Sequence, residues 1–142
     1  MVHETEIPLV LIWRVREKAN RFLVQELRNH NVEGLAPSHG DILWALFKNR
    51  SLSMKQLAEI IDRDKSTVTA LVNKLIKLGY VRKTPDATDS RVLRITLTKK
   101  GEGLQDTLVD ISGRLLEKFY KNLSEKERND LAALLVKIND GW

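Results

Sequence analysis

The sequence of 142 residues contains no cysteine. This absence excludes disulfide bonds, thiolate metal sites and cysteine-based redox switching. Histidine is scarce too, and none of the three histidines has a second histidine at the H-x-x-x-H spacing of a helical metal site. His30, His39 and Asp41 are close enough in sequence to leave a weak zinc site as an alternative. We predict that the protein has no metal site and needs no cofactor.

Long hydrophobic runs are also missing. No apolar run approaches the roughly 18 residues that cross a bilayer, and residues 1–6 lack the basic start and apolar core of a signal peptide. We therefore expect a cytoplasmic protein with no membrane contact. Hydrophobic residues still make up 42% of the chain, enough to form the core of one domain or of two small lobes.

Motifs of catalysis are absent from the sequence as well. It shows no nucleophile–base pair, no glycine-rich phosphate loop and no pair of carboxylates that a fold would bury together. We predict that the protein is not an enzyme.

Positive charge is concentrated in the middle of the chain. Residues 36–101 contain thirteen Lys or Arg and six Asp or Glu, a net charge of +7, whereas residues 1–35 are neutral and residues 102–142 have a net charge of −2. A basic surface attracts phosphates by Coulomb attraction and by counterion release. The central segment is therefore the candidate contact for a nucleic acid, with a solvated lysine-rich face as the alternative.

Hydrophobic periodicity predicts that the chain is mainly helical. Apolar residues recur at three- and four-residue steps over 7–29 and 37–48. A long helix is expected after Thr98 and a final helix after Ser124, because both residues have side chains typical of helix caps. The segment 49–51 is interpreted as a break between helices.

A helix-turn-helix followed by a β-hairpin is predicted in the centre of the chain. The S-x-x-Q capping box at 53–56 begins a short helix, and the next helix covers 65–78. Two short helices joined by a tight turn form a helix-turn-helix. Residues 80–84 and 92–97 are predicted as strands, and in the second Leu93, Ile95 and Leu97 alternate with Arg94 and Thr96. The long polar turn between the two strands makes a hairpin, the wing.

The predicted fold class is mainly α with a small β-hairpin wing, organised as a winged helix-turn-helix lobe and a helical dimerisation lobe. We place an N-terminal dimerisation helix at 1–35, the DNA-binding lobe at 36–101 and C-terminal dimerisation helices at 102–142. The first and last helices have one apolar face and are too long to pack only against a small winged helix. We therefore expect a homodimer, with a monomeric helical bundle as the alternative.

The helix over 65–78 presents short polar side chains opposite its apolar stripe. A helix that enters the major groove needs such residues in order to approach base edges. Asn73 is a candidate for an adenine edge, and Thr67 and Ala70 are candidates for a thymine methyl group. An ordinary solvent-exposed face is the alternative. The full set of candidate DNA-contacting residues is Ser53, Lys55, Gln56, Lys65, Ser66, Thr67, Thr69, Ala70, Asn73, Lys74, Asp89 and Arg91.

Arg91 lies in the turn of the predicted wing, two residues after Asp89. A hairpin tip stands clear of the protein body, and an arginine there can enter a narrow minor groove. We hypothesise that Asp89 orients the guanidinium through a bidentate pair and so orders the tip before binding. The alternative is a solvated surface ion pair worth roughly 0–1 kcal/mol.

At these residues the chain resembles the MarR family of bacterial and archaeal transcription regulators. The resemblance rests on segments 66–75 and 79–83, on Asp89-Ser90-Arg91 and on Leu97-Thr98-Lys99-Lys100-Gly101, and it covers nearly the whole chain. The resemblance implies a homodimeric winged-helix protein on a palindromic operator, with the outer face of helix 65–78 in the major groove and Arg91 in the minor groove. One departure is Ala36, where many members have a capping Thr; Ser38 is the candidate substitute.

The resemblance also implies a small phenolic or aromatic carboxylate effector that releases the DNA. Trp13 and Trp44 lie on helices that would border such a site, and Arg14 would supply a cation. The alternative is that both tryptophans anchor a core or an interface. Peroxide sensing of the kind found in some members is excluded, since it needs a reactive cysteine.

Two classes of function remain. The first is a sequence-specific regulator of transcription, a repressor in the simplest case, that binds double-stranded DNA as a homodimer. The second is a winged-helix module for protein–protein interaction without DNA binding. The charge of the central segment and the small polar face of helix 65–78 favour the first, because interaction helices usually expose aromatic or aliphatic anchors.

Overall fold

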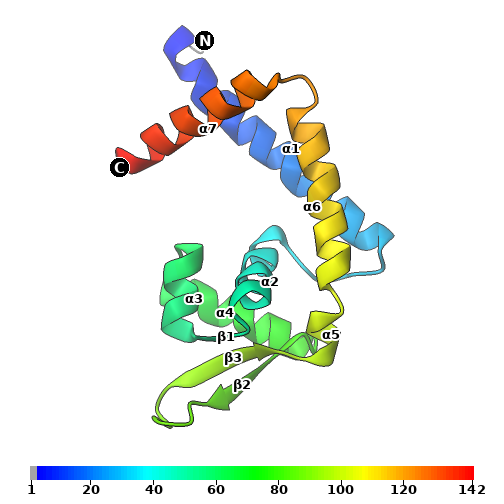
Figure 1. Cartoon of the computed structure of the whole chain (residues 1–142), viewed down its shortest axis with the longest axis vertical. Coiled ribbons are helices and arrows are strands. Elements are labelled where there is room, and N and C mark those ends of the chain that lie inside the picture. The colour runs from blue at the N-terminus through cyan, green and yellow to red at the C-terminus, as the bar shows by residue number, and fades with distance from the viewer. Residues whose placement is uncertain (1–2) are drawn as a thin grey trace. The chain divides into compact units, whose positions relative to one another are not determined.

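The computed structural model describes residues 3–142, which form seven α-helices, one short 3-10 helix and three strands (Figure 1). In chain order these are η1 (Glu4–Glu6), α1 (Ile7–Asn29), α2 (Pro37–Asn49), β1 (Ser51–Ser53), α3 (Met54–Ile61), α4 (Lys65–Lys77), β2 (Val81–Pro85), β3 (Leu93–Leu97), α5 (Lys99–Glu102), α6 (Gln105–Tyr120) and α7 (Glu125–Asp140). Within this described part, no helix combines the length and apolarity needed to span a membrane.

The chain divides into two compact units. The first ends at Ile111 and contains the winged helix, and the second covers Ser112–Trp142. The boundary between them falls within α6. The predicted division at 35/36 and 101/102 was made by function, into dimerisation helices and a DNA-binding lobe, and not by compactness. It stays a prediction.

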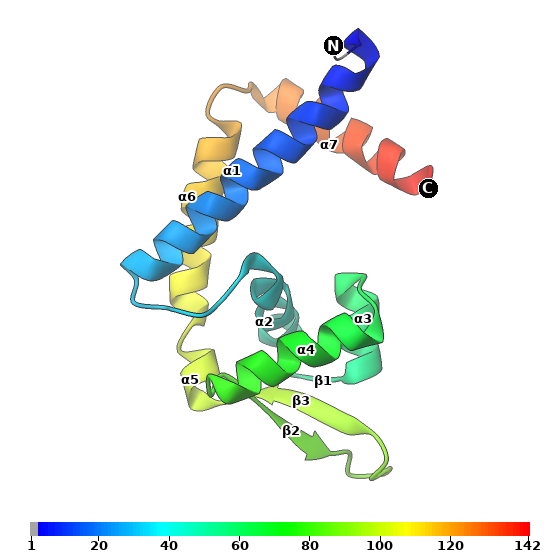
Figure 2. The ribbon, with the colours of Figure 1, turned by 180° about the vertical axis from the view of Figure 1, so that it is seen from behind.

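The sheet has three antiparallel strands in the order β1-β3-β2. The hairpin of β2 and β3 reaches beyond the helices of the first unit, as a wing should (Figures 1 and 2). Strand β1 was not predicted, because the sequence analysis placed only a break between helices at 49–51. Its three residues pair with β3, with Ser51 opposite Thr96 and Ser53 opposite Arg94. A strand this short has no periodicity of its own, so only its distant partner reveals it.

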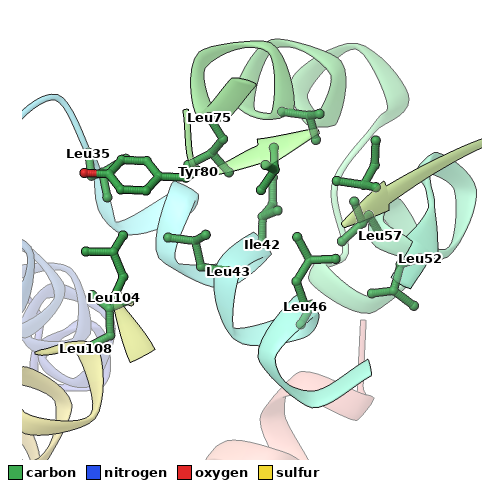
Figure 3. Packing of buried hydrophobic residues seen from close by; sticks show 14 of the residues in the cluster. Leu35, Ile42, Leu43, Leu46, Leu52, Leu57, Leu75, Tyr80, Leu104 and Leu108 are labelled. Atoms are coloured by element: carbon green, nitrogen blue, oxygen red, sulfur yellow. The ribbon is translucent and has the colours of Figure 1, made fainter. Parts of the chain in front are cut away.

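The core of the first unit fixes α4 against α2 and α3. Ile42, Leu43 and Leu46 of α2 are fully buried and meet Leu57 of α3 and Leu75 of α4 (Figure 3). Burying one such side chain contributes about 1.5–3 kcal/mol relative to leaving it exposed. Helix α4 is therefore held by its apolar stripe, and its opposite face is left to solvent.

The helix ends confirm most of the local predictions. Ser53 and Gln56 form the expected capping box, with Ser53 N–H donating to Gln56 Oε1 at 2.9 Å and Gln56 N–H donating to Ser53 Oγ at 3.1 Å. Ser124 Oγ likewise accepts from the N–H of Glu127 at 3.2 Å. At α2 the candidate capping side chain was that of Ser38. In the structure the side chain of His39 takes part in the cap, since the N–H of Ala36 donates to His39 Nδ1 at 2.9 Å.

The long helix expected after Thr98 is interrupted. Helix α5 ends at Glu102 and α6 begins at Gln105. Gly101 and Gly103 lie at this point, and glycine costs about 1 kcal/mol relative to alanine in a helix. The cap at Thr98 is present, since its Oγ1 accepts from the N–H of Gly101 at 3.2 Å.

Helix α5 is tied to the end of α4. The hydroxyl of Thr98 donates to the carbonyl of Gly79, and the N–H of Thr98 donates to the carbonyl of Tyr80 at 3.0 Å. Lys100 Nζ donates to the carbonyl of Leu78 at 2.8 Å. Gly79 has φ +83°, the left-handed conformation expected for the residue after a helix. These bonds satisfy the carbonyls of residues 78–80, which follow α4, and anchor the base of the wing.

Candidate nucleic-acid interface

Helix α4 begins at a tight turn that follows α3. Asp62 ends α3 in the left-handed conformation with φ 52°, and Asp64 caps α4. Asp64 Oδ1 accepts from the N–H of Thr67 at 2.7 Å and from Ser66 Oγ at 3.0 Å. The hydrogen bonds from Thr67, followed by that from Ser66, hold the pKa of Asp64 below its ordinary value of 3.8. The first turn of the helix is therefore preorganised.

The outward face of α4 carries the predicted contact residues. Val68, Val72 and Leu75 are fully buried, and the other side of the helix faces solvent. Figure 2 shows α4 running in front of the sheet, above the wing. Of the predicted residues on this helix, Lys65, Ser66, Ala70, Asn73 and Lys74 are exposed, and Thr67 and Thr69 are half-buried.

Two hydroxyls on this face are already donating. Ser66 Oγ donates to Asp64, and Thr69 Oγ1 donates to the carbonyl of Lys65 at 2.8 Å. Asn73 Oδ1 accepts from Lys83 Nζ of β2 at 3.2 Å. Lys83 was not among the predicted residues, because its proximity to Asn73 depends on how the hairpin packs against the helix.

The turn of the wing is closed by Asp86. Its Oδ2 accepts from the N–H of Thr88 at 3.1 Å, from Thr88 Oγ1 at 2.7 Å and from the N–H of Asp89 at 3.2 Å. The side-chain and backbone bonds from Thr88, then that from Asp89, lower the pKa of Asp86. An acidic residue that accepts backbone N–H groups two and three positions later forms a local turn, so this role was accessible from sequence.

Arg91 is held by Asp89 at the end of the wing. Arg91 Nε lies 3.1 Å from Asp89 Oδ1 and Arg91 Nη2 lies 3.2 Å from Asp89 Oδ2, which is the bidentate geometry that we hypothesised. The backbone N–H of Arg91 also donates to Asp89 Oδ1 at 3.1 Å. These bonds lower the pKa of Asp89, the side-chain bond most. The Arg91 side chain is 89% exposed, so an oriented cation is presented to solvent.

The three predicted residues at the start of α3 have different surroundings. Ser53 and Gln56 use their side chains in the capping box. Gln56 Oε1 also lies 3.5 Å from Nη1 of Arg94. Lys55 is exposed. Their contact with DNA stays a prediction. The side chains of Ser53 and Gln56 are engaged in the capping box, whereas that of Lys55 is exposed.

A cavity of about 990 Å³ opens beside α2 and α3. Trp44 and Phe47 form part of its wall and pack edge to face, with ring centroids 5.7 Å apart. Asp41 and Lys48 supply charged groups, and desolvation raises the pKa of Asp41 despite the opposing charge of Arg63. Trp13 and Arg14, which we expected beside Trp44, do not line this cavity.

The residues considered for zinc are engaged elsewhere. His30 Nδ1 lies 2.8 Å from the carbonyl of Glu26, and His30 Nε2 lies 3.6 Å from Asp110. His39 is buried with its Nδ1 on the Ala36 N–H, and burial lowers its pKa. Within residues 3–142, no three histidine or acidic side chains are grouped as metal ligands.

Comparisons with known proteins agree on one family. Residues 33–92 match the model described as MarR family. The HTH-type transcriptional regulator SarZ of Staphylococcus aureus is 36% identical over 90 residues, which are 63% of this chain and 60% of SarZ. Among solved structures, a mutant MarR from E. coli complexed with operator DNA has a TM-score of 0.82 at 25% identity, over 93% of this chain and 94% of that one. The segment that contains most of the winged helix is therefore similar to the MarR family.

Two further solved structures show how widely the fold of this chain is shared. BpsR of Bordetella bronchiseptica gives a TM-score of 0.84 at 22% identity, over 97% of this chain and 96% of that one. A MarR transcriptional regulator from Methanosarcina mazei Go1 gives 0.80 at 20% identity, over 96% of both chains. Both confirm the predicted winged-helix fold class. The chain matches only about 60% of the length of SarZ. SarZ is named as a transcriptional regulator, in keeping with the prediction that the chain is not an enzyme.

Arg94 is the residue that the sequence analysis missed most clearly. It lies on β3 between exposed Leu93 and buried Ile95, which looks like an ordinary outward position of a half-buried strand. In the structure it contacts Ser51, Gln56 and Asp86. No local signal identifies it, since Ser51 and Gln56 are 43 and 38 residues away in the sequence.

Proposed function

We propose that two copies of this chain bind a palindromic site on double-stranded DNA and thereby repress transcription in the cytoplasm. The observation that carries the proposal is the exposed Arg91, oriented by Asp89, on the same winged helix as the polar face of α4. The match of residues 33–92 to the MarR family and the likeness to a solved MarR complexed with operator DNA support it.

The major groove would receive α4. Short side chains on its outward face let the helix backbone approach the base edges, and Lys65 and Lys74 would contact phosphates. Ser66, Thr67, Thr69, Ala70 and Asn73 are the proposed base-facing residues. This face has no aromatic residue and no large aliphatic residue that is exposed. It lacks the anchors of a protein–protein interface, which favours DNA over the alternative interaction module.

A second copy of the chain would cover the apolar faces of the first and last helices. Isolated exposed apolar residues are common, but a long series on one helix indicates a contact surface. In α1 these residues are Ile7, Leu9, Leu11, Ile12, Trp13 and Val15. In α7 they are Leu134, Leu135, Val136 and Ile138. Each series lies outside the wing and α4, so assembly through them would leave both DNA-contacting elements free.

Binding should be strong at low salt and should weaken steeply as salt rises. Each phosphate that a Lys or Arg neutralises makes the slope of log K against log salt concentration more negative by about 0.9. Fluorescence anisotropy with the duplex upstream of the gene, measured from about 50 to 200 mM salt, would give this slope. Sedimentation velocity on the same samples should show two chains of 16.3 kDa per site. A monomer at micromolar concentration, or no affinity for any duplex in dilute buffer, would overturn the proposal.

A small aromatic effector is proposed for the cavity beside α2 and α3. BpsR has been solved in work on regulation of its DNA binding by 6-hydroxynicotinic acid. The aromatic wall of the cavity suits a ligand of that kind, and Lys48 would supply the cation that we had expected from Arg14.

Replacing Trp44 should impair release of DNA by such a ligand. Removing one aromatic wall is expected to raise the ligand concentration for half-release by about tenfold. Anisotropy of a preformed DNA complex, titrated with hydroxylated aromatic acids including 6-hydroxynicotinic acid, measures this directly. Trp13→Phe is the control, since Trp13 does not line the cavity. An equal response in Trp44→Ala and wild type would place the effector elsewhere.

A further inference from the structure

Arg94 joins three parts of the winged helix. Its Nε lies 3.1 Å from Ser51 Oγ of β1, and its Nη2 lies 3.4 Å from the Ser51 carbonyl. Its Nη1 lies 3.5 Å from Oε1 of Gln56, which belongs to the capping box of α3. Its Nε also lies 3.7 Å from Oδ1 of Asp86 in the wing. One guanidinium thus contacts the edge strand, the first helix of the helix-turn-helix and the wing.

These contacts are partly shielded from solvent. The side chains of Arg94 and Asp86 are 31% and 25% exposed, whereas those of Arg91 and Asp89 are 89% and 40% exposed. A guanidinium has five N–H donors in a rigid fork, so it can hold several acceptors at once in a fixed arrangement. The Arg94 cluster is therefore better suited to fixing geometry than a free surface ion pair is.

Asp86 continues this connection toward the tip of the wing. One of its oxygens faces Arg94, and the other accepts the three hydrogen bonds from Thr88 and Asp89 that close the turn. Asp89 in turn holds the guanidinium of Arg91. A continuous series of polar contacts therefore runs from the N-terminus of α3 through Arg94 and Asp86 to the exposed cation.

We infer that Arg94 is a positioning residue for DNA binding, which holds the wing at a fixed reach from the helix-turn-helix. The inference rests on the proposed function, in which α4 and Arg91 must engage one duplex at the same time. Without Arg94, the wing would have to be ordered during binding, and ordering costs free energy. Arg94 would therefore strengthen binding through Arg91, without a DNA contact of its own.

A double-mutant cycle between Arg94→Met and Arg91→Ala tests this inference. Arg94→Met should weaken DNA binding by about three- to tenfold in the wild-type background. It should change binding by less than about twofold when Arg91 is already alanine, since coupled residues are not additive. The salt slope of Arg94→Met should equal that of the wild type, because no phosphate contact is lost.

Arg82→Met is the matched control. Arg82 is exposed on the neighbouring strand β2. Among the contacts that the structure gives for the described residues, its side chain has no hydrogen bond or ion pair, and the substitution removes the same charge as Arg94→Met. It should lower affinity equally in both Arg91 backgrounds. If Arg94→Met behaved like this control, or reduced the salt slope by about one, Arg94 would act through charge or by touching phosphate, and the inference would fail.

A measurement without DNA keeps the two proposals separate. Backbone ¹⁵N relaxation of the free protein should show increased mobility at Thr88 and Asp89 in Arg94→Met and unchanged mobility in Arg82→Met. Unchanged order in Arg94→Met would overturn the inference even if DNA binding were confirmed. A wild type that bound no duplex would overturn the proposed function. If only the inference failed, the wild type would bind DNA normally, and the losses of affinity in Arg94→Met and Arg91→Ala would add in the double variant.

Discussion

Arg91→Ala should weaken operator binding by about 30- to 100-fold while leaving the fold intact. The side chain is 89% exposed and is bonded to Asp89 at the tip of the wing, so its loss removes nothing from the core. A charge-assisted hydrogen bond contributes about 1.5 kcal/mol or slightly less when partly solvated, and a dimer would lose one such contact in each wing. Two losses of that size correspond to the expected fold-change.

Fluorescence anisotropy at constant salt would measure the effect, with circular dichroism to check the fold. Arg21→Ala is a suitable control, because Arg21 is 70% exposed on α1 and its removal changes the net charge by the same amount. The expected loss should be concentrated on sites with A·T-rich flanks, where the minor groove is narrow and most negative. If both variants bound the operator like the wild type, the wing would not take part in recognition.

Gly101→Ala should destabilise the protein by about 3 kcal/mol. A Cβ at this position would come within 2.0 Å of the carbonyl oxygen of Tyr80 and within 3.1 Å of Leu97 Cδ2. The obstructing oxygen belongs to the backbone and already accepts the N–H of Thr98, so it cannot move without disturbing that bond. The close approach of α5 to the end of α4 therefore requires glycine here.

Thermal or urea denaturation would measure this loss, and Gly40→Ala provides the control. Gly40 lies in α2, and a Cβ there would meet nothing within 4 Å. Alanine is favoured over glycine within a helix by about 0.5–1 kcal/mol, so the control should be neutral or slightly stabilising. Equal stability of Gly101→Ala and wild type would show that α5 can shift without cost.

The parts of the fold that were predicted from sequence depend on neighbouring residues. Helix α1 was predicted over 7–29 and observed at Ile7–Asn29, because hydrophobic periodicity and the following polar segment define both ends. The cap at Asp64 and the turn of the wing were also accessible, because each is formed by side chains that bond backbone groups two or three residues away.

The parts that were not predicted depend on contacts between distant segments. Strand β1 exists because Leu52 lies opposite Ile95, and the roles of Arg94 and Lys83 require the packed hairpin. The cavity illustrates the same limit. The family resemblance suggested that Trp13 and Trp44 border one site, but only the fold shows that Phe47 and Lys48 accompany Trp44 there. Periodicity identifies which face of a helix is buried, but it does not identify the neighbours across that face.

The outward face of α4 has a fixed hydrogen-bond polarity. An ammonium group can only donate, so Lys83 determines that the oxygen of the Asn73 amide is turned toward β2 and that its two N–H bonds point away. The hydroxyl hydrogens of Ser66 and Thr69 are engaged within the protein, so these oxygens face outward with lone pairs only. A molecule that lies along this face therefore meets hydroxyl acceptors at Ser66 and Thr69 and amide donors at Asn73, beside the ammonium groups of Lys65 and Lys74.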